Sequence, residues 1–147
     1  MHTNTTIQDY RLSEHERQYK QACLSEYKWK AATWCAWCFA VSTGFTGWYA
    51  FRAGYPVSGA TAIFTGGVNV MLVVAVVAAI ATFVAKQRKD TLRRDVALMN
   101  IDAEAWSRRV EASLAEDRAR IRANGWLWTA VAILANVLFT VVLVSFW

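Results

Sequence analysis

The chain has 147 residues, enough for one domain, and its apolar fraction of 56% exceeds the 45–50% or so that is usual for soluble domains. The formal net charge is +5, but acidic residues accompany the basic ones in the same segments, so the charge does not require a nucleic-acid partner. Three uncharged stretches each reach the 20 residues or so that a helix needs to cross a bilayer. The sequence therefore predicts an all-α integral membrane protein with three transmembrane helices.

Residues 1–30 are predicted to form a cytoplasmic N-terminal helix. Ser13 and Glu16 have the spacing of a capping box, which predicts that this helix begins at Ser13. Tyr19, Cys23 and Tyr27 follow at intervals of four residues, so they form one apolar stripe along the helix.

A transmembrane hairpin is predicted next: residues 31–51 form the first span, residues 52–56 a short outer turn, and residues 57–85 the second span. Small residues recur every fourth position in both spans, and such rows let two helices approach closely in lipid. The predicted helix-packing positions are Ala32, Ala36, Ala40 and Gly44 in the first span and Ser58, Ala62 and Gly66 in the second.

The first span contains a C-x-x-C motif, Cys35 and Cys38, which can be a redox pair, half of a metal site, or two small packing residues. Both cysteines fall inside lipid near the cytoplasm, where disulfides do not persist and burial makes a thiol less reactive. The two histidines, His2 and His15, lie outside the spans and cannot complete a metal site there. We therefore predict packing residues, with no metal and no cofactor.

Residues 86–124 are predicted to form a cytoplasmic helical hairpin or, alternatively, one long amphipathic helix on the membrane surface. One unbroken helix over residues 86–123 would carry the chain about 57 Å away from the membrane, so we favour a break at residues 100–102, capped by Asn100 or Asp102. Trp106 can serve as a core anchor or as a contact for a partner. The predicted cytoplasmic interaction seam, spaced like a heptad, is Leu92, Val96, Met99, Trp106 and Val110.

The third span is predicted over residues 125–147. Asn136 near its middle and Asn69 near the middle of the second span are the predicted intramembrane polar contacts, because a carboxamide in hydrocarbon needs a hydrogen-bonding partner. Three arrangements satisfy this need: a mutual hydrogen bond, a contact with another subunit, or the lining of a narrow pore.

Charge distribution predicts the orientation of the spans. Fifteen of the sixteen basic residues lie in residues 1–30 and 86–123, and the other is Arg52 in the outer turn. By the positive-inside rule, the N-terminus and the central segment are cytoplasmic and the C-terminus is outside, in a multi-pass protein of the bacterial inner membrane.

No set of residues with catalytic spacing is visible, and the spans contain no ionisable Asp, Glu, Lys, Arg or His. We therefore expect a protein that is not an enzyme, with no cofactor, no nucleic-acid partner and no evident small-molecule substrate. Its expected partners are membrane lipid and other membrane subunits or copies of itself. It would serve as a subunit of a larger envelope, secretion or conjugation complex, or as an exclusion- or immunity-type protector against one.

The alternative function is an oligomeric pore, of the holin or defence-effector kind. The order of a cytoplasmic helix, two spans and a further cytoplasmic helix over residues 30–120 resembles the two-span pore-forming effectors of bacterial nucleotide-signalled defence. The resemblance implies a homo-oligomeric pore, and the third span departs from it.

Overall fold

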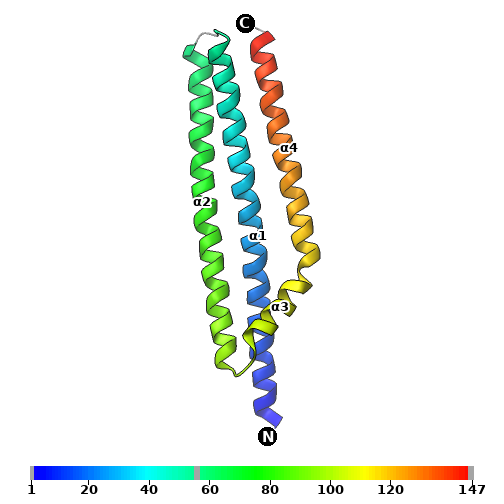
Figure 1. The fold of residues 1–147 in the computed structure, drawn as a ribbon. Helices are drawn as coiled ribbons and strands as arrows, with labels where there is room; N and C mark the ends of the chain where they lie inside the picture. The colour runs from blue at the N-terminus through cyan, green and yellow to red at the C-terminus, as the bar shows by residue number, and fades with distance from the viewer. Residues whose placement is uncertain (1, 55–56, 146–147) are drawn as a thin grey trace. The chain divides into compact units, whose positions relative to one another are not determined.

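The computed structural model describes the backbone of residues 2–54 and 57–145, and the side-chain surroundings of residues 6–49, 51–54, 67–138 and 141–142. The all-α class is confirmed over these residues (Figure 1). The helices are α1 (His2–Arg52), α2 (Val57–Leu98), α3 (Ala103–Ser113) and α4 (Ala115–Ser145). The chain forms two compact units: unit 1 comprises Met1–Trp29 and Ile80–Ile121, and unit 2 comprises Lys30–Ala79 and Arg122–Trp147.

Helix α1 begins at His2, so the predicted helix start at Ser13 is wrong. Ser13 lies inside the helix, where its hydroxyl donates to the carbonyl oxygen of Tyr10 at 2.8 Å. No glycine or proline stands between residues 2 and 12 to stop the helix, so the local capping signal does not set its first residue.

The turn between α1 and α2 falls within the predicted residues 52–56. Helix α1 ends at Arg52, and Gly54 has a φ of 80°, a backbone conformation that residues with a Cβ rarely adopt. Residues 55 and 56 lie outside the described part of the chain, and α2 begins at Val57.

The predicted break at residues 100–102 is present. Helix α2 ends at Leu98, Asn100 has a left-handed φ of 59°, and the Asp102 carboxylate caps α3 by accepting from the backbone of Glu104 and Ala105, both at 3.1 Å. The alternative of one long surface helix is therefore wrong.

A second break, at Leu114 between α3 and α4, was not predicted. The heptad spacing of the seam also changes here, because Val110 is followed by Leu114 after four residues instead of three, and this is the local sign of the break. Residues 86–124 are thus not a separate hairpin, because their outer parts continue the helices α2 and α4.

The core of unit 1 joins the N-terminal stripe to the predicted seam. The rings of Tyr19 and Trp106 lie 5.0 Å apart between centroids. The buried cluster consists of Tyr19, Cys23, Leu92, Val96, Trp106, Val110 and Leu114. Met99 is only partly buried. The seam is therefore mainly a core and not a free surface for a partner, which corrects the predicted interaction seam and makes Trp106 a core residue.

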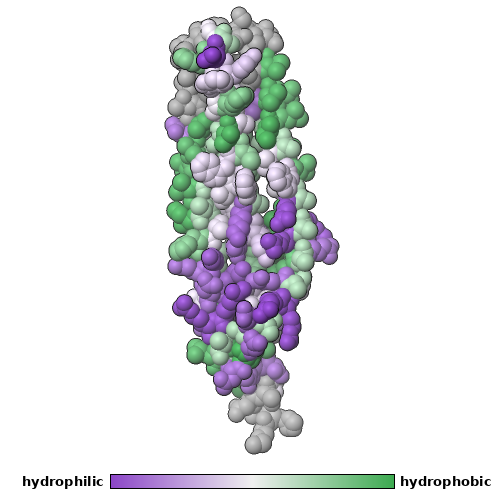
Figure 2. Space-filling view, viewed as in Figure 1, coloured by the Kyte–Doolittle hydropathy of each residue, from purple (hydrophilic) through white to green (hydrophobic). Residues whose placement is uncertain are grey.

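Two described helical stretches are long and apolar enough to cross a membrane, Gly67–Leu98 and Ala115–Leu138. Figure 2 shows hydrophobic side chains exposed along the parts of α2 and α4 that belong to unit 2. The uncharged half of α1 is less apolar than these two stretches, because its many tryptophan, threonine, serine and glycine residues lower its hydropathy. Composition thus supports two of the three predicted spans.

Candidate functional site

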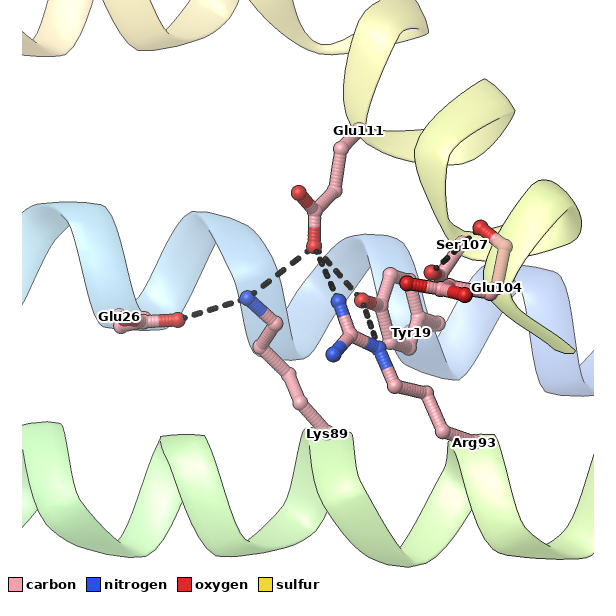
Figure 3. A network of polar contacts seen from close by, with 7 residues as sticks. All are labelled: Tyr19, Glu26, Lys89, Arg93, Glu104, Ser107 and Glu111. Carbon is pink, nitrogen blue, oxygen red and sulfur yellow. Dashed lines mark hydrogen bonds and ion pairs between the residues drawn. The ribbon is translucent and has the colours of Figure 1, made fainter.

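A network of charged side chains connects three helices in unit 1 (Figure 3). The Lys89 Nζ lies 2.9 Å from a carboxylate oxygen of Glu26 and 3.3 Å from one of Glu111. The same Glu111 oxygen is 3.1 Å from an Arg93 nitrogen and accepts from the Tyr19 hydroxyl at 2.7 Å. Arg93 also donates to the Tyr19 hydroxyl oxygen at 3.0 Å. Two carboxylates therefore balance two cations.

The network is built by α1, α2 and α3 together. Tyr19 and Glu26 come from α1, Lys89 and Arg93 from α2, and Glu111 from α3. The side chains of Lys89 and Glu26 are only 13% and 7% exposed. Charges this deeply buried are tolerated when they are paired, so each helix depends on the other two.

Burial and pairing set the protonation states of these groups. Burial raises the pKa of Tyr19 to about 12 and that of Cys23 to about 11, so both are neutral near pH 7. Burial alone would lower the pKa of Lys89, but the hydrogen bond to Glu26 and the negative charge of that carboxylate raise it overall. Burial alone would raise the pKa of Glu111, but the Tyr19 hydrogen bond and the two cations lower it. The arrangement keeps the ion pairs charged and gives neither Tyr19 nor Cys23 the character of an activated nucleophile.

Sequence reasoning missed this network, although one signal was available. Ala85, Lys89, Leu92 and Val96 are spaced by four, three and four residues, so Lys89 occupies a core position of the seam. A lysine at such a position predicts a buried anionic partner. The sequence does not say which carboxylate fills that role.

A second polar contact lies in unit 2. The side-chain nitrogen of Asn136, a buried residue of α4, donates to the hydroxyl oxygens of Ser42 at 2.8 Å and Thr43 at 3.0 Å on α1. Asn69 is exposed on α2, and no hydrogen bond joins the two amides within the described residues. The mutual bond, one of the three alternatives for these asparagines, is therefore wrong, because α4 brings Asn136 to the hydroxyls of α1.

Helices α1 and α4 run parallel in unit 2. A Cβ placed on Gly125 would lie 3.2 Å from the Cβ of Ala31, so the two backbones come close at this point. Gly125 and Ala31 are 94 residues apart in the chain, as are Asn136 and Ser42. Because the difference in residue number is the same at both contacts, the two helices run in the same direction.

Comparisons of the chain with protein-family models, curated proteins and solved structures found no match.

The predicted small-residue rows are only partly used for packing. Ala36 and Ala40 are buried and Ala32 is partly buried, whereas Gly44 is exposed and a Cβ placed on it would meet no atom within 4 Å. The side chains predicted in the second row lie outside the described part of the chain: Ser58, Ala62 and Gly66. The close approach at Gly125 was not predicted.

The C-x-x-C motif carries no bond between its two sulfurs. Cys35 and Cys38 are free thiols and are partly buried. In the part of the chain that the structure describes, no three His, Cys, Asp or Glu side chains gather as a metal site. A packing role for both cysteines stays a prediction.

Proposed function

We propose that the chain is a three-span protein of the bacterial inner membrane that acts by contact with other membrane-embedded chains, without catalysis and without a cofactor. The parallel contact of α1 and α4 supports a span in α1, the one predicted span that composition alone does not support. Because Ser42 lies beside Asn136 and Ala31 beside Gly125, a bilayer that contains this part of α4 also contains residues 31–42 of α1. The uncharged part of α1, which is less apolar than α2 and α4, is then partly covered by α4.

The distribution of charge supports the proposed orientation. Fifteen of sixteen basic residues fall in residues 1–30 and 86–123, which favours a cytoplasmic N-terminus, a cytoplasmic unit 1 and an outer C-terminus.

The exposed carboxamide of Asn69 is the observation that carries the contact function. Asn69 lies on a stretch of α2 that is apolar enough to cross a membrane, and its exposed neighbours Val70 and Val73 are 58% and 63% accessible. A carboxamide facing hydrocarbon loses its hydrogen bonds to water and costs free energy until another group replaces them. A contact with a neighbouring chain supplies that group.

Two roles make use of such a contact. A subunit of a larger envelope, secretion or conjugation complex would bind its neighbours permanently through this surface. An exclusion- or immunity-type protector would bind a foreign membrane machine and block it. Both roles require the same physical features: an inserted helical scaffold, a specific polar contact and a stable cytoplasmic unit.

An oligomeric pore is the second candidate, and the same residue favours it. In a ring of copies, the exposed Asn69 carboxamide would line the lumen. The remaining lining would be nearly uncharged, which suits a gated constriction better than an open channel. The pore predicts that expression alone depolarises cells, whereas the contact function predicts no loss of membrane potential.

Extraction in mild detergent tests the contact function. The tagged chain is purified from native membranes, and the mass of the eluted complex is compared for the unaltered chain, Asn69→Leu and the control Val70→Leu. We expect a defined complex that Asn69→Leu weakens and Val70→Leu leaves intact. A monomer carrying only lipid and detergent would contradict the proposal.

A further inference from the structure

Asn69 lies on the side of α2 that faces away from the packed interior of unit 2. Ala75 and Ala78 are 3% and 0% exposed, so they mark the face of α2 that packs inside the chain. At 3.6 residues per turn, these two alanines lie about 120° and 180° around the helix from Asn69. The small-residue face is therefore already covered, while the face with the amide has no partner among the described residues.

The exposed face has the pattern of a helix-pairing seam. Asn69, Val73 and Val76 are spaced by four and three residues, and Leu72 lies beside them. Leu72, Val73 and Val76 are 37%, 63% and 58% exposed. A seam of branched apolar side chains with one asparagine is a pattern that fixes register when two helices pair.

We propose that this face of α2, made by Asn69, Leu72, Val73 and Val76, binds the same face of a second copy of the chain, with the two Asn69 carboxamides hydrogen-bonded to each other. The inference rests on the proposed membrane-embedded function and names its partner.

Symmetry makes a second copy the best match. Two copies inserted in the same orientation have parallel α2 helices, and a two-fold axis along the membrane normal places identical residues at identical depth. A carboxamide carries both a donor and an acceptor, so each Asn69 nitrogen donates to the other Asn69 oxygen. A second copy therefore supplies a complementary group at the required depth.

The other intramembrane amide does not compete for this role. Asn136 is buried and already donates to Ser42 and Thr43 within its own chain. Between the two asparagines of the spans, only Asn69 is exposed to a neighbour.

Cysteine crosslinking in native membranes tests the pairing without altering Asn69. The chain is first freed of its own thiols by Cys23→Ala, Cys35→Ala and Cys38→Ala. Single substitutions then place a thiol on the proposed pairing face of α2, at Val73→Cys or Val76→Cys. The control substitutions, Val70→Cys and Val74→Cys, place a thiol about 100° and 140° around the helix from Asn69. After mild oxidation, dimers are measured on a non-reducing gel.

We expect Val73→Cys and Val76→Cys to form disulfide dimers several times faster than the two controls. Adding Asn69→Leu should lower the association constant by about 3- to 30-fold, the range expected for a hydrogen bond between membrane helices. Equal rates at all four positions, no dimer at any of them, or crosslinks to a different protein would overturn the proposal.

A second reaction separates this failure from a failure of the proposed function. If the thiols of Val73→Cys and Val76→Cys stay protected from a water-soluble maleimide but form no dimer, the proposed membrane-embedded function stands. Only the second copy as the partner is then overturned. Seam thiols that react freely with the maleimide overturn both. If the cysteine-free chain does not accumulate, sedimentation of the unaltered chain and Asn69→Leu in mild detergent gives the same comparison, and equal association of the two overturns the proposal.

Discussion

The side-chain nitrogen of Asn136 lies 3.0 Å from the hydroxyl oxygen of Thr43, a residue 93 positions earlier in the chain. This contact joins the last helix of unit 2 to the first, and a second bond from the same nitrogen to Ser42 at 2.8 Å fixes the level at which the two helices meet. Polar contacts of this kind determine register in lipid, where apolar side chains gain little by leaving one hydrocarbon surface for another.

The Asn136 contact predicts a measurable coupling between two substitutions. Asn136→Leu and Thr43→Val should each lower the free energy of unfolding by about 1 kcal/mol, and the double variant should lose less than the sum. Tryptophan fluorescence during unfolding in mixed micelles measures all three. Asn69→Leu is the matched control, because its exposed amide should leave the stability of the monomer unchanged. Strict additivity would contradict the contact.

The close approach at Gly125 predicts that this position does not accept a larger residue. Gly125→Val places atoms against Ala31, whose Cβ already lies 3.2 Å from the position of a Gly125 Cβ, and should lower the free energy of unfolding by about 1–3 kcal/mol. Gly44→Ala is the control, because a Cβ there meets no atom within 4 Å. It should be neutral or stabilise the helix by up to about 1 kcal/mol. The same unfolding assay tests both, and an equal loss in the two variants would contradict the packing.

The buried ion pair in unit 1 predicts a large loss when one partner is removed. Lys89→Met removes the Nζ that lies 2.9 Å from the Glu26 carboxylate, which is 7% exposed, and should cost about 3–5 kcal/mol. Adding Glu26→Leu should restore much of that loss, because an apolar pair of similar volume avoids the cost of burying a charge. The control is Arg120→Ala, which removes the exposed Arg120–Glu116 pair and should change the free energy by no more than about 1 kcal/mol. Urea unfolding followed by fluorescence measures each variant.

Acid should weaken unit 1 through Glu111. Its pKa in the folded protein is below the ordinary 4.5, so its contribution is complete above about pH 4.5 and is lost as the pH falls through the folded pKa. We expect thermal stability to be flat near neutral pH and to fall below about pH 4.5, with a smaller fall in Glu111→Gln. Glu116→Gln, at an exposed carboxylate, should behave like the unaltered chain. An unchanged acid profile in Glu111→Gln would contradict the role of this group.

Periodicity along one helix predicted part of the fold. The stripe of Tyr19 and Cys23 and the seam of Leu92 and Val96 were visible because apolar side chains on one face have to be covered. The cap at Asp102 was visible because its carboxylate satisfies backbone groups only two and three residues ahead. Such features depend on neighbours in sequence.

Lateral pairing of helices was less predictable. Asn136 pairs with hydroxyls that lie 93 and 94 residues earlier, and the sequence pattern does not say which helix is its neighbour. The partner of Lys89 was hidden for the same reason. The capping signal at Ser13 was misleading, because the helix extends past Ser13 toward the N-terminus and begins at His2.

The hydroxyls of Ser42 and Thr43 have a consequence for the order in which the chain is assembled during synthesis. Both already donate to the carbonyl oxygen of Phe39 in their own helix, at 2.9 and 2.8 Å. In the proposed membrane arrangement, α1 and α2 therefore enter the bilayer with these two hydroxyl groups satisfied while α4 is still unmade. The Asn136 nitrogen of α4 then meets hydroxyl oxygens that α1 has already brought into the bilayer, at 2.8 and 3.0 Å. In that arrangement, α1 is the template on which α4 completes its insertion.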